Sequence, residues 1–429
     1  MATDARRALD VFPAGIANGE FALPAEQLVV MDRGEGCRLW DTSGREYLDF
    51  SMAWGSCLVG HARPEIVDAV RRQAGQGSNF AYLNAPLLEL AEEIRRVSPA
   101  SETMRFCASG TEANMYCHRL ARAFTGKSKL LKFEGAYHGA NAAGVASLFP
   151  TKLRPFPQPE LTSAGIPMAR FDLLVAPYND LPETMRIVEE NAADLAAVVM
   201  EPLQRCTPPE PGFLQAVRSL CSAHGLLLVF DEVVTGFRLA YGGAQEYYGV
   251  TPDLVAYGKA LGGGYPIGVF AGRADIMDLV SESRLGADTY VWMASTLGGN
   301  PISAAAANAA LSVLRTPGTY ERLHGLGRYL REAMARVLAD LGIEGRIIGD
   351  GPIAQVVFTA KPVRDYRSTY DSDRDLGRRL MLALFARGIF LNPMGTKLYL
   401  SVAHDEAVCD AFIERFGDAL SSLMHDRVA

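Results

Sequence analysis

The chain has 429 residues, 49% of them hydrophobic and 21% charged, which is typical of a folded globular protein and excludes disordered or collagen-like material. With 42 Lys and Arg against 49 Asp and Glu, the net charge is −7, so no overall positive field favours nucleic acid or an anionic membrane. The seven cysteines contain no C-x-x-C pair, which argues against a disulfide framework or structural zinc. Residues 1–13 lack the apolar run of a secretion signal, and we expect a cytoplasmic protein.

The first part of the chain, residues 23–50, predicts a small antiparallel element. Short apolar or aromatic strand candidates alternate there with turns, in the order strand Val29-Val30, turn Arg33–Gly36, strand Cys37–Trp40, turn Asp41–Gly44 and strand Tyr47–Phe50.

The middle of the chain alternates short apolar runs with helix-period segments, which indicates parallel β/α units. The runs Leu195–Met200 and Leu226–Phe230 read as strands buried on both faces, and Gly212–His224 reads as the helix between them. Each run is followed at once by a carboxylate, Glu201 or Asp231. Ligands of open α/β sheets collect at the carboxyl ends of strands, so both acids are candidate site residues.

An uncharged stretch at Thr289–Leu314 is long enough to span a bilayer but contains hydroxyl residues, Gly, Asn and Pro. We predict a loop followed by a buried helix, and no membrane partner. From about Arg315 the chain alternates helices with short strands and predicts an α+β lobe. The predicted organisation is an N-terminal segment at 1–55 that joins the small domain, a large α/β domain at 56–314 and a small domain at 315–429.

The segment Cys107–Asn114 is a candidate phosphate cradle. Ser109 with Glu112 three residues later fits a capping box, and Gly110 and Thr111 follow Ser109 at the start of a helix. Backbone amides and a hydroxyl would converge there, as in phosphate sites at helix N-termini. A plain capped helix is the alternative.

Two further residues follow apolar runs. Asp231 closes the run that ends at Phe230, where its partner is a metal, a protonated pyridine nitrogen or only the next helix. His138 and His224 lack metal-ligand spacing, which lowers the metal option. Lys259 emerges between Gly258 and Gly262, where few neighbours can solvate it, and desolvation depresses the pKa of an amine. A lysine there is either a Schiff-base nucleophile or an ordinary surface charge.

The remaining candidates are a ring and a hydroxyl-rich loop. Tyr137 and His138 follow the run Leu130–Phe133, and an aromatic side chain there can stack on a flat cofactor or lie in the core. The hydroxyl-rich loop Ser295–Pro301 offers a second phosphate-binding helix end or only a helix cap. A phosphate cradle, a stacking ring, an acid at a strand end and a desolvated lysine together match pyridoxal 5′-phosphate.

The residues also resemble a known family, the class III, fold type I pyridoxal-phosphate enzymes, and within it the glutamate-1-semialdehyde aminomutase-like branch. The likeness runs from about Asp41 to His404 and is most specific at Phe230–Arg238, Tyr241–Glu246, Thr251–Asp253 and Gly258-Lys259. It implies a mostly parallel α/β large domain with a smaller α+β domain, and a homodimer with active sites shared at the subunit interface.

The resemblance also implies roles for single residues. Lys259 would form the Schiff base and Asp231 would pair with the pyridine nitrogen, and these two are the predicted catalytic residues. The other predicted cofactor contacts are Tyr137 on the ring, its neighbour His138, Glu201 and Val233 in the pocket, Ser109, Gly110 and Thr111 at the phosphate, and Thr296 from the neighbouring subunit. No metal is expected.

Two departures bear on the substrate. The aminomutases carry an Arg in the N-terminal segment, but Pro13–Phe21 contains neither Arg nor Lys, and the Glu that they place before Ser401 has no counterpart in Pro393–Lys397. We therefore predict a ping-pong aminotransferase that moves an amino group from a small-molecule amine or amino acid to a keto acid or aldehyde. The alternatives are an intramolecular aminomutase, a racemase or epimerase, and a non-catalytic binding homologue.

Overall fold

A computed structural model describes residues 3–19, 23–166, 172–391 and 396–428. The chain forms two compact units, each described separately below. The large unit contains Glu65–Tyr320 together with Val363–Ser368, and the small unit contains Met1–Pro64, Glu321–Pro362 and Thr369–Ala429. The short excursion of Val363–Ser368 into the large unit has no counterpart in the boundaries predicted from the sequence.

The large unit is built on a sheet that has seven strands in the described part of the chain, in the order β4-β10-β9-β8-β7-β5-β6. β10 is antiparallel to both of its neighbours, and every other neighbouring pair is parallel. The strands are β4 (Thr103–Cys107), β5 (Lys129–Phe133), β6 (Leu173–Ala176), β7 (Leu195–Met200), β8 (Leu227–Asp231), β9 (Leu254–Tyr257) and β10 (Gly268–Gly272). The predicted mostly parallel sheet is confirmed.

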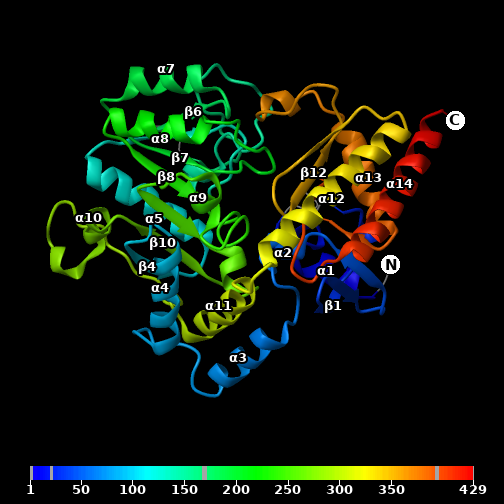
Figure 1. Cartoon of the computed structure of the whole chain (residues 1–429), viewed down its shortest axis with the longest axis horizontal. Helices are drawn as coiled ribbons and strands as arrows, with labels where there is room; N and C mark the ends of the chain where they lie inside the picture. The colour runs from blue at the N-terminus through cyan, green and yellow to red at the C-terminus, as the bar shows by residue number, and fades with distance from the viewer. Residues whose placement is uncertain (1–2, 20–22, 167–171, 392–395, 429) are drawn as a thin grey trace. The chain divides into compact units, whose positions relative to one another are not determined.

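The large unit also contains helices, some of which cover the sheet (Figure 1). They are α3 (Pro64–Ala74), α4 (Ala85–Val97), α5 (Gly110–Thr125), α6 (Ala142–Val145), α7 (Leu181–Asn191), α8 (Phe213–Ala223), α9 (Gly243–Tyr248), α10 (Ala274–Met277) and α11 (Pro301–Leu314). The predicted helix at Gly212–His224 is confirmed as α8, and the stretch Thr289–Leu314 is confirmed as a loop followed by the buried helix α11. In the described ranges no helix has both the length and the apolar character needed to cross a membrane.

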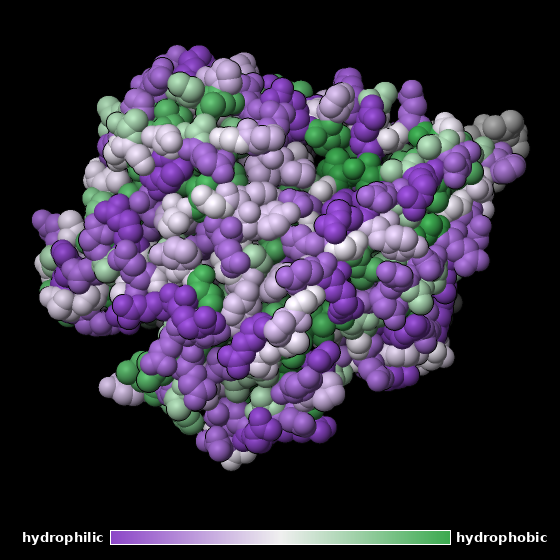
Figure 2. Space-filling view, in the orientation of Figure 1, coloured by the Kyte–Doolittle hydropathy of each residue, from purple (hydrophilic) through white to green (hydrophobic). Residues whose placement is uncertain are grey.

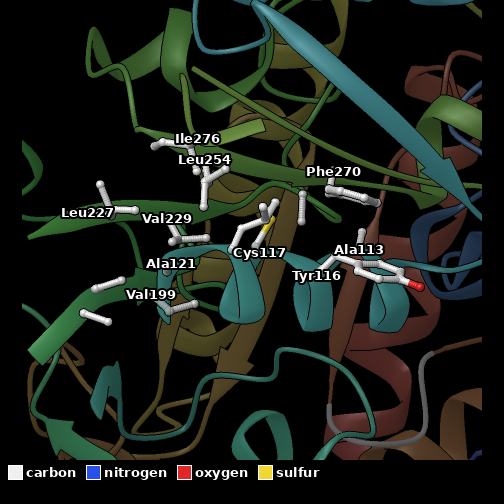
Figure 3. Packing of buried hydrophobic residues seen from close by; sticks show 14 of the residues in the cluster. Ala113, Tyr116, Cys117, Ala121, Val199, Leu227, Val229, Leu254, Phe270 and Ile276 are labelled. Atoms are coloured by element: carbon white, nitrogen blue, oxygen red, sulfur yellow. The ribbon is translucent and has the colours of Figure 1, made fainter. Parts of the chain in front are cut away.

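The core of the large unit lies between α5 and one face of the sheet, as Figure 3 shows. Ala113, Cys117 and Ala121 repeat at helical spacing along α5 and are fully buried. They pack against alternate residues of the strands, including Val199 and Val229. This packing fixes the start of α5 over the carboxyl ends of the strands.

In its described residues the small unit forms two sheets, with strand orders β1-β2-β3-β13 and β11-β12-β14. Its strands are β1 (Met31–Glu35), β2 (Arg38–Asp41), β3 (Glu46–Asp49), β11 (Arg346–Ile348), β12 (Ile353–Val357), β13 (Ile389–Phe390) and β14 (Lys397–Tyr399). Its helices are α1 (Thr3–Val11), α2 (Met52–Gly55), α12 (Thr319–Asp340, whose first two residues belong to the large unit), α13 (Arg374–Ala386) and α14 (Glu406–Val428).

The antiparallel element predicted at 23–50 is confirmed, but its first strand was placed wrongly. The predicted strand at Val29-Val30 and the predicted turn at Arg33–Gly36 are replaced by β1 at Met31–Glu35. β1 is an edge strand with mostly exposed side chains, so it carries polar residues that resemble a turn in the sequence.

The segment α2 is a left-handed turn. Met52, Ala53 and Trp54 have φ of 46°, 50° and 59°, and each such residue with a side chain costs about 1–2 kcal/mol. Asp49 Oδ1 compensates by accepting hydrogen bonds from the backbone N–H groups of Ser51 and Met52, at 2.8 and 2.9 Å. The strained turn is therefore held by a buried carboxylate.

Candidate active site

The predicted site residues follow strands whose carboxyl ends lie at one edge of the large sheet. β4, β5, β7, β8 and β9 run in the same direction, so the residues after them share this edge. Asp231 ends β8, Glu201 follows β7, and Lys259 begins the 3-10 turn η3 (Lys259–Gly262) after β9. The structure thus brings acid and amine groups from distant parts of the sequence to one edge.

Asp231 is 4% exposed and is held by three hydrogen bonds. Oδ2 accepts from Asn114 Nδ2 at 3.0 Å and from His138 Nδ1 at 2.8 Å, and Oδ1 accepts from the backbone N–H of Val233 at 3.0 Å. An ionised carboxylate only accepts, so His138 is assigned its proton on Nδ1. A carboxylate has about four acceptor sites, and these bonds leave room on Oδ1 for one further donor.

Glycines bring the ends of three strands into contact. A Cβ on Gly110, after β4, would lie 2.7 Å from Val233 Cγ2, after β8. A Cβ on Gly258, after β9, would lie 3.4 Å from Val233 Cγ1 and 3.6 Å from Gly110 Cα. Gly110, Val233 and Gly258 are therefore neighbours, and Lys259 is the next residue of the chain.

The backbone at Lys259 is strained. Its φ is 41°, in the left-handed region where a residue with a side chain pays of order 1–3 kcal/mol. The preceding Gly258 is extended, and Lys259 is half-buried. The sequence predicted a tight loop that directs this amine from the strand end, and the structure confirms the loop.

The capping box predicted at the start of α5 is confirmed, with one change. Ser109 Oγ accepts from the backbone N–H of Glu112 at 3.2 Å and donates to Glu112 Oε2 at 3.1 Å. Glu112 Oε2 also accepts from the backbone N–H of Ala108, one residue before the cap. The hydroxyl of Ser109 is thus engaged in the cap, whereas the first amides of a helix, here those of Gly110 and Thr111, lack partners within the helix.

The loop after β5 joins Tyr137 and His138 to the other groups. Glu201 Oε1 accepts from the backbone N–H of Tyr137 at 2.8 Å, and Thr111 Oγ1 accepts from that of Ala140 at 3.3 Å. A Cβ on Gly139 would lie 2.6 Å from Thr111 Cα, so the loop passes directly over the start of α5. Burial raises the pKa of the half-buried Tyr137.

Two residues of this arrangement were missed in the sequence. Lys132, on β5, is 1% exposed, and its Nζ donates to the carbonyl oxygens of Ala136 at 2.8 Å, Gly144 at 3.0 Å and Ala146 at 2.7 Å. Burial lowers the pKa of Lys132 to about 7. Asn114 was inside the predicted motif without a role. The signal for Lys132 was a charged residue within an apolar strand, and the signal for Asn114 was an amide on the apolar face of α5, because such residues are rarely buried without a partner.

Thr296 is exposed in the loop before α11. Its carbonyl accepts from Asn79 Nδ2 at 3.0 Å, and Ser295 Oγ donates to Glu112 Oε1 at 3.4 Å. A Cβ on Gly298 would lie 2.4 Å from the carbonyl oxygen of Phe106, so the loop packs on the end of β4. Glu20 and Phe21 of the N-terminal segment, and Pro393–Gly395, lie outside the described residues.

Comparisons with known proteins agree with this fold. The family model of the class-III aminotransferases matches residues 22–420, and the chain belongs to this family. It is therefore an enzyme of fold type I whose cofactor is pyridoxal phosphate.

The similar proteins are named for different activities. The chain is 37% identical over 424 residues to the glutamate-1-semialdehyde 2,1-aminomutase of Desulfitobacterium hafniense, with 97% of each chain covered. An ω-transaminase structure from Sphaerobacter thermophilus matches with a TM-score of 0.90 and 34% identity, covering 98% of this chain and 97% of that one. A β-phenylalanine aminotransferase from Variovorax paradoxus matches with a TM-score of 0.86 and 31% identity, covering 97% and 92%.

Proposed function

We propose that the chain is an intermolecular aminotransferase that uses pyridoxal phosphate at the carboxyl edge of the large sheet. The observation that carries the proposal is the convergence of Asp231, Lys259 and the start of α5 around the contact of Gly110, Val233 and Gly258. This edge provides an anionic acceptor, an amine on a strained turn and a helix N-terminus, which complement the cofactor's pyridine nitrogen, aldehyde and phosphate.

The described residues fit this cofactor. The open acceptor site on Asp231 Oδ1 suits a protonated ring nitrogen, and the amides of Gly110 and Thr111 suit the phosphate. Tyr137 would stack on the ring, with His138 behind Asp231, and Glu201 and Val233 would complete the pocket. Ser109 would support the phosphate site through the cap of α5.

When bound, pyridoxal phosphate would supply an aldehyde that condenses with amines and a ring that accepts the electron pair left on carbon when a proton is removed. Lys259 Nζ would act as the base that takes this proton from the amine-bearing carbon of the substrate and later delivers a proton. Asp231 would keep the ring nitrogen protonated, because a buried carboxylate favours a nearby positive charge. His138 and Asn114 would hold the carboxylate of Asp231 in its orientation.

The substrates would be a small-molecule amine or amino acid and a keto acid or aldehyde. Because the N-terminal segment Pro13–Phe21 has no Arg or Lys, we expect weak use of donors whose only recognition group is a carboxylate next to the amine. The ω-transaminase and β-phenylalanine aminotransferase relatives support transfer between two molecules.

Intramolecular transfer is the second candidate function, and the aminomutase relatives favour it. It would need a single substrate and no external acceptor. A racemase or epimerase would use Lys259 to exchange only the proton on the amine-bearing carbon.

We further propose a cytoplasmic homodimer in which Thr296 of each chain completes the site of the other. In the large unit, exposed apolar side chains flank Thr296, with Tyr82 80%, Leu83 77% and Leu297 54% exposed. Asn79 and Asn84 donate hydrogen bonds to the carbonyl oxygens of Thr296 and Gly299. These bonds hold the segment with Tyr82 and Leu83 against the loop with Thr296 and Leu297. Apolar residues also reach the surface near the start of α4 in Figure 2. Such a patch suits a second copy.

The test is a half-reaction followed by the visible absorption of the cofactor. A panel of amines and amino acids is added to the holoenzyme without an acceptor. An aminotransferase predicts a stoichiometric loss of the visible band that a keto acid or aldehyde restores. Isomerisation of a single substrate with no stoichiometric loss would favour the mutase, and proton exchange alone would favour the epimerase.

A further inference from the structure

A short strap, defined as Val363–Ser368, belongs to the large unit although the chain on both sides of it belongs to the small unit. Ser368 Oγ accepts from the backbone N–H groups of Arg364 at 3.0 Å and Asp365 at 3.1 Å, and Ser368 N–H donates to Asp365 Oδ1 at 2.7 Å. The strap is therefore a tight, internally bonded turn from which its larger side chains project.

Arg367 of the strap forms a bidentate ion pair with a buried carboxylate. Its Nε donates to Glu134 Oε2 at 2.7 Å and its Nη2 to Glu134 Oε1 at 3.1 Å, and Glu134 is 4% exposed. Nη2 also donates to the carbonyl oxygen of Arg154 at 2.6 Å, and the guanidinium carbon lies 3.7 Å from the ring centre of Phe156. Planar stacking and two parallel hydrogen bonds fix this side chain.

Glu134 is the first residue after β5 and begins the loop that carries Tyr137 and His138. Its backbone N–H donates to Ala176 O at 2.9 Å, and its carbonyl oxygen accepts from Gln204 Nε2 at 2.7 Å. The next residue, Gly135, has a φ of 85°, and a Cβ there would lie 3.0 Å from Tyr366 Cβ of the strap. The strap therefore contacts the first two residues of this loop.

We infer that Arg367 is a positioning residue for the cofactor site, acting through Glu134 on the placement of Tyr137 and His138. The inference rests on the proposed function, which assigns these two residues to the cofactor. Further along, the loop is bound by Glu201 at the Tyr137 N–H and by Asp231 at His138. Loss of Arg367 would leave the carboxylate of Glu134 buried without its cation, which forces the start of the loop to rearrange.

The experiment compares Arg367→Met with Arg364→Met in the full chain. Arg364 is in the same strap and also makes an ion pair, to Glu210 at 3.2 Å, and a bond to Asn179 O at 2.6 Å, but these partners are outside the Tyr137 loop. For each variant, the dissociation constant of pyridoxal phosphate, the visible circular dichroism of the bound cofactor and the Tm of the cofactor-free protein are measured.

Arg367→Met is expected to weaken cofactor binding about tenfold or more and to reduce the visible dichroism, because small displacements of positioning groups have effects of this size. Arg364→Met should leave both readouts at the wild-type level, and Arg367→Lys should recover part of them. Wild-type values for Arg367→Met, or equal losses in both variants, would overturn the inference.

If Arg367→Met fails to fold, Glu134→Gln with Arg367→Met removes the charge and its partner together. Recovery of folding with a still reduced visible dichroism supports the positioning role, and recovery of both overturns it. Failure of the proposed function can be distinguished from failure of this inference. If the proposed function is wrong, the wild-type protein itself would show no visible dichroism from a bound cofactor.

Discussion

Asp231 and His138 are joined by a hydrogen bond of 2.8 Å between Oδ2 and Nδ1, although 93 positions separate them in the chain. Both side chains are almost fully buried, at 4% and 1% exposure. Asn114 binds the same oxygen, so Oδ2 is saturated by side chains and Oδ1 remains the atom that can face a ligand. Asn114 of helix α5 and His138 of the loop after β5 thus fix the carboxylate at the end of β8.

Replacement of Asp231 tests the role of this carboxylate at the cofactor. Asp231→Ala is expected to lower kcat by several orders of magnitude, roughly 10³-fold or more, because charge stabilisation at the reacting centre is lost. Single-turnover kinetics with a reactive donor measure the effect. A near-wild-type rate in a correctly folded variant would mean that the ring nitrogen pairs with another group.

Replacement of His138 tests whether Asp231 needs its support. His138→Gln keeps a donor but changes its position, and we expect a loss in kcat of about 10- to 100-fold, smaller than for Asp231→Ala. The two variants and their combination form a double-mutant cycle in kcat. If His138 acts through Asp231, adding His138→Gln to Asp231→Ala should cost little more, whereas full additivity would contradict this coupling.

Lys132 offers a test of the loop that follows β5. Lys132→Met removes the amine that binds four carbonyl oxygens of the segment Ala136–Ala146, and it should lower both Tm and cofactor affinity. Lys129→Met on the same strand is the control. The Lys129 side chain is partly exposed, and its Nζ lies 3.3 Å from Asp194 Oδ2, which is outside the segment Ala136–Ala146. Cofactor titration and thermal unfolding measure both variants, and equal effects would contradict a specific role for Lys132.

The ion pair of Asp49 and His61 predicts a pH dependence of stability. Burial alone would lower the pKa of His61, but the hydrogen bond to Asp49 and the influence of Cys57 outweigh it and raise the pKa from 6.5 to about 10. A raised pKa means that the stabilisation is complete below pH 6.5 and is lost as the pH rises to about 10.

His61→Gln should therefore lower Tm most below pH 6.5, with the difference from the wild type shrinking towards pH 10. Thermal unfolding at a series of pH values measures this difference. A Tm difference that stays constant across this range would show that the pair does not carry the charge assigned to it.

Sequence patterns were sufficient where local chemistry determines the structure. Continuous apolar runs predicted β7 and β8, and the spacing of Ser109 and Glu112 predicted the cap of α5. The position of Lys259 between glycines predicted its tight turn. Each of these patterns involves only residues that are close together in the chain, so it can be recognised in a single sequence.

Other features depend on contacts between distant segments. The bonds of Asn114 and His138 to Asp231, and that of Arg367 to Glu134, join residues far apart in the chain, and no local pattern predicts them. The edge strand β1 was placed wrongly because its polar side chains resemble a turn until the neighbouring strand is known. Long-range pairing is decided by the fold as a whole.

In the proposed function, Lys259 holds the cofactor at the carboxyl edge of the large sheet. The most direct measurement is to reduce the holoenzyme with borohydride, which fixes the cofactor on the amine that carries it, and to map the labelled peptide by mass spectrometry. We expect a single pyridoxyl label on Lys259 in the wild type and no label in Lys259→Ala. A label on another lysine, such as Lys132, or no label on a cofactor-bound wild type, would contradict it.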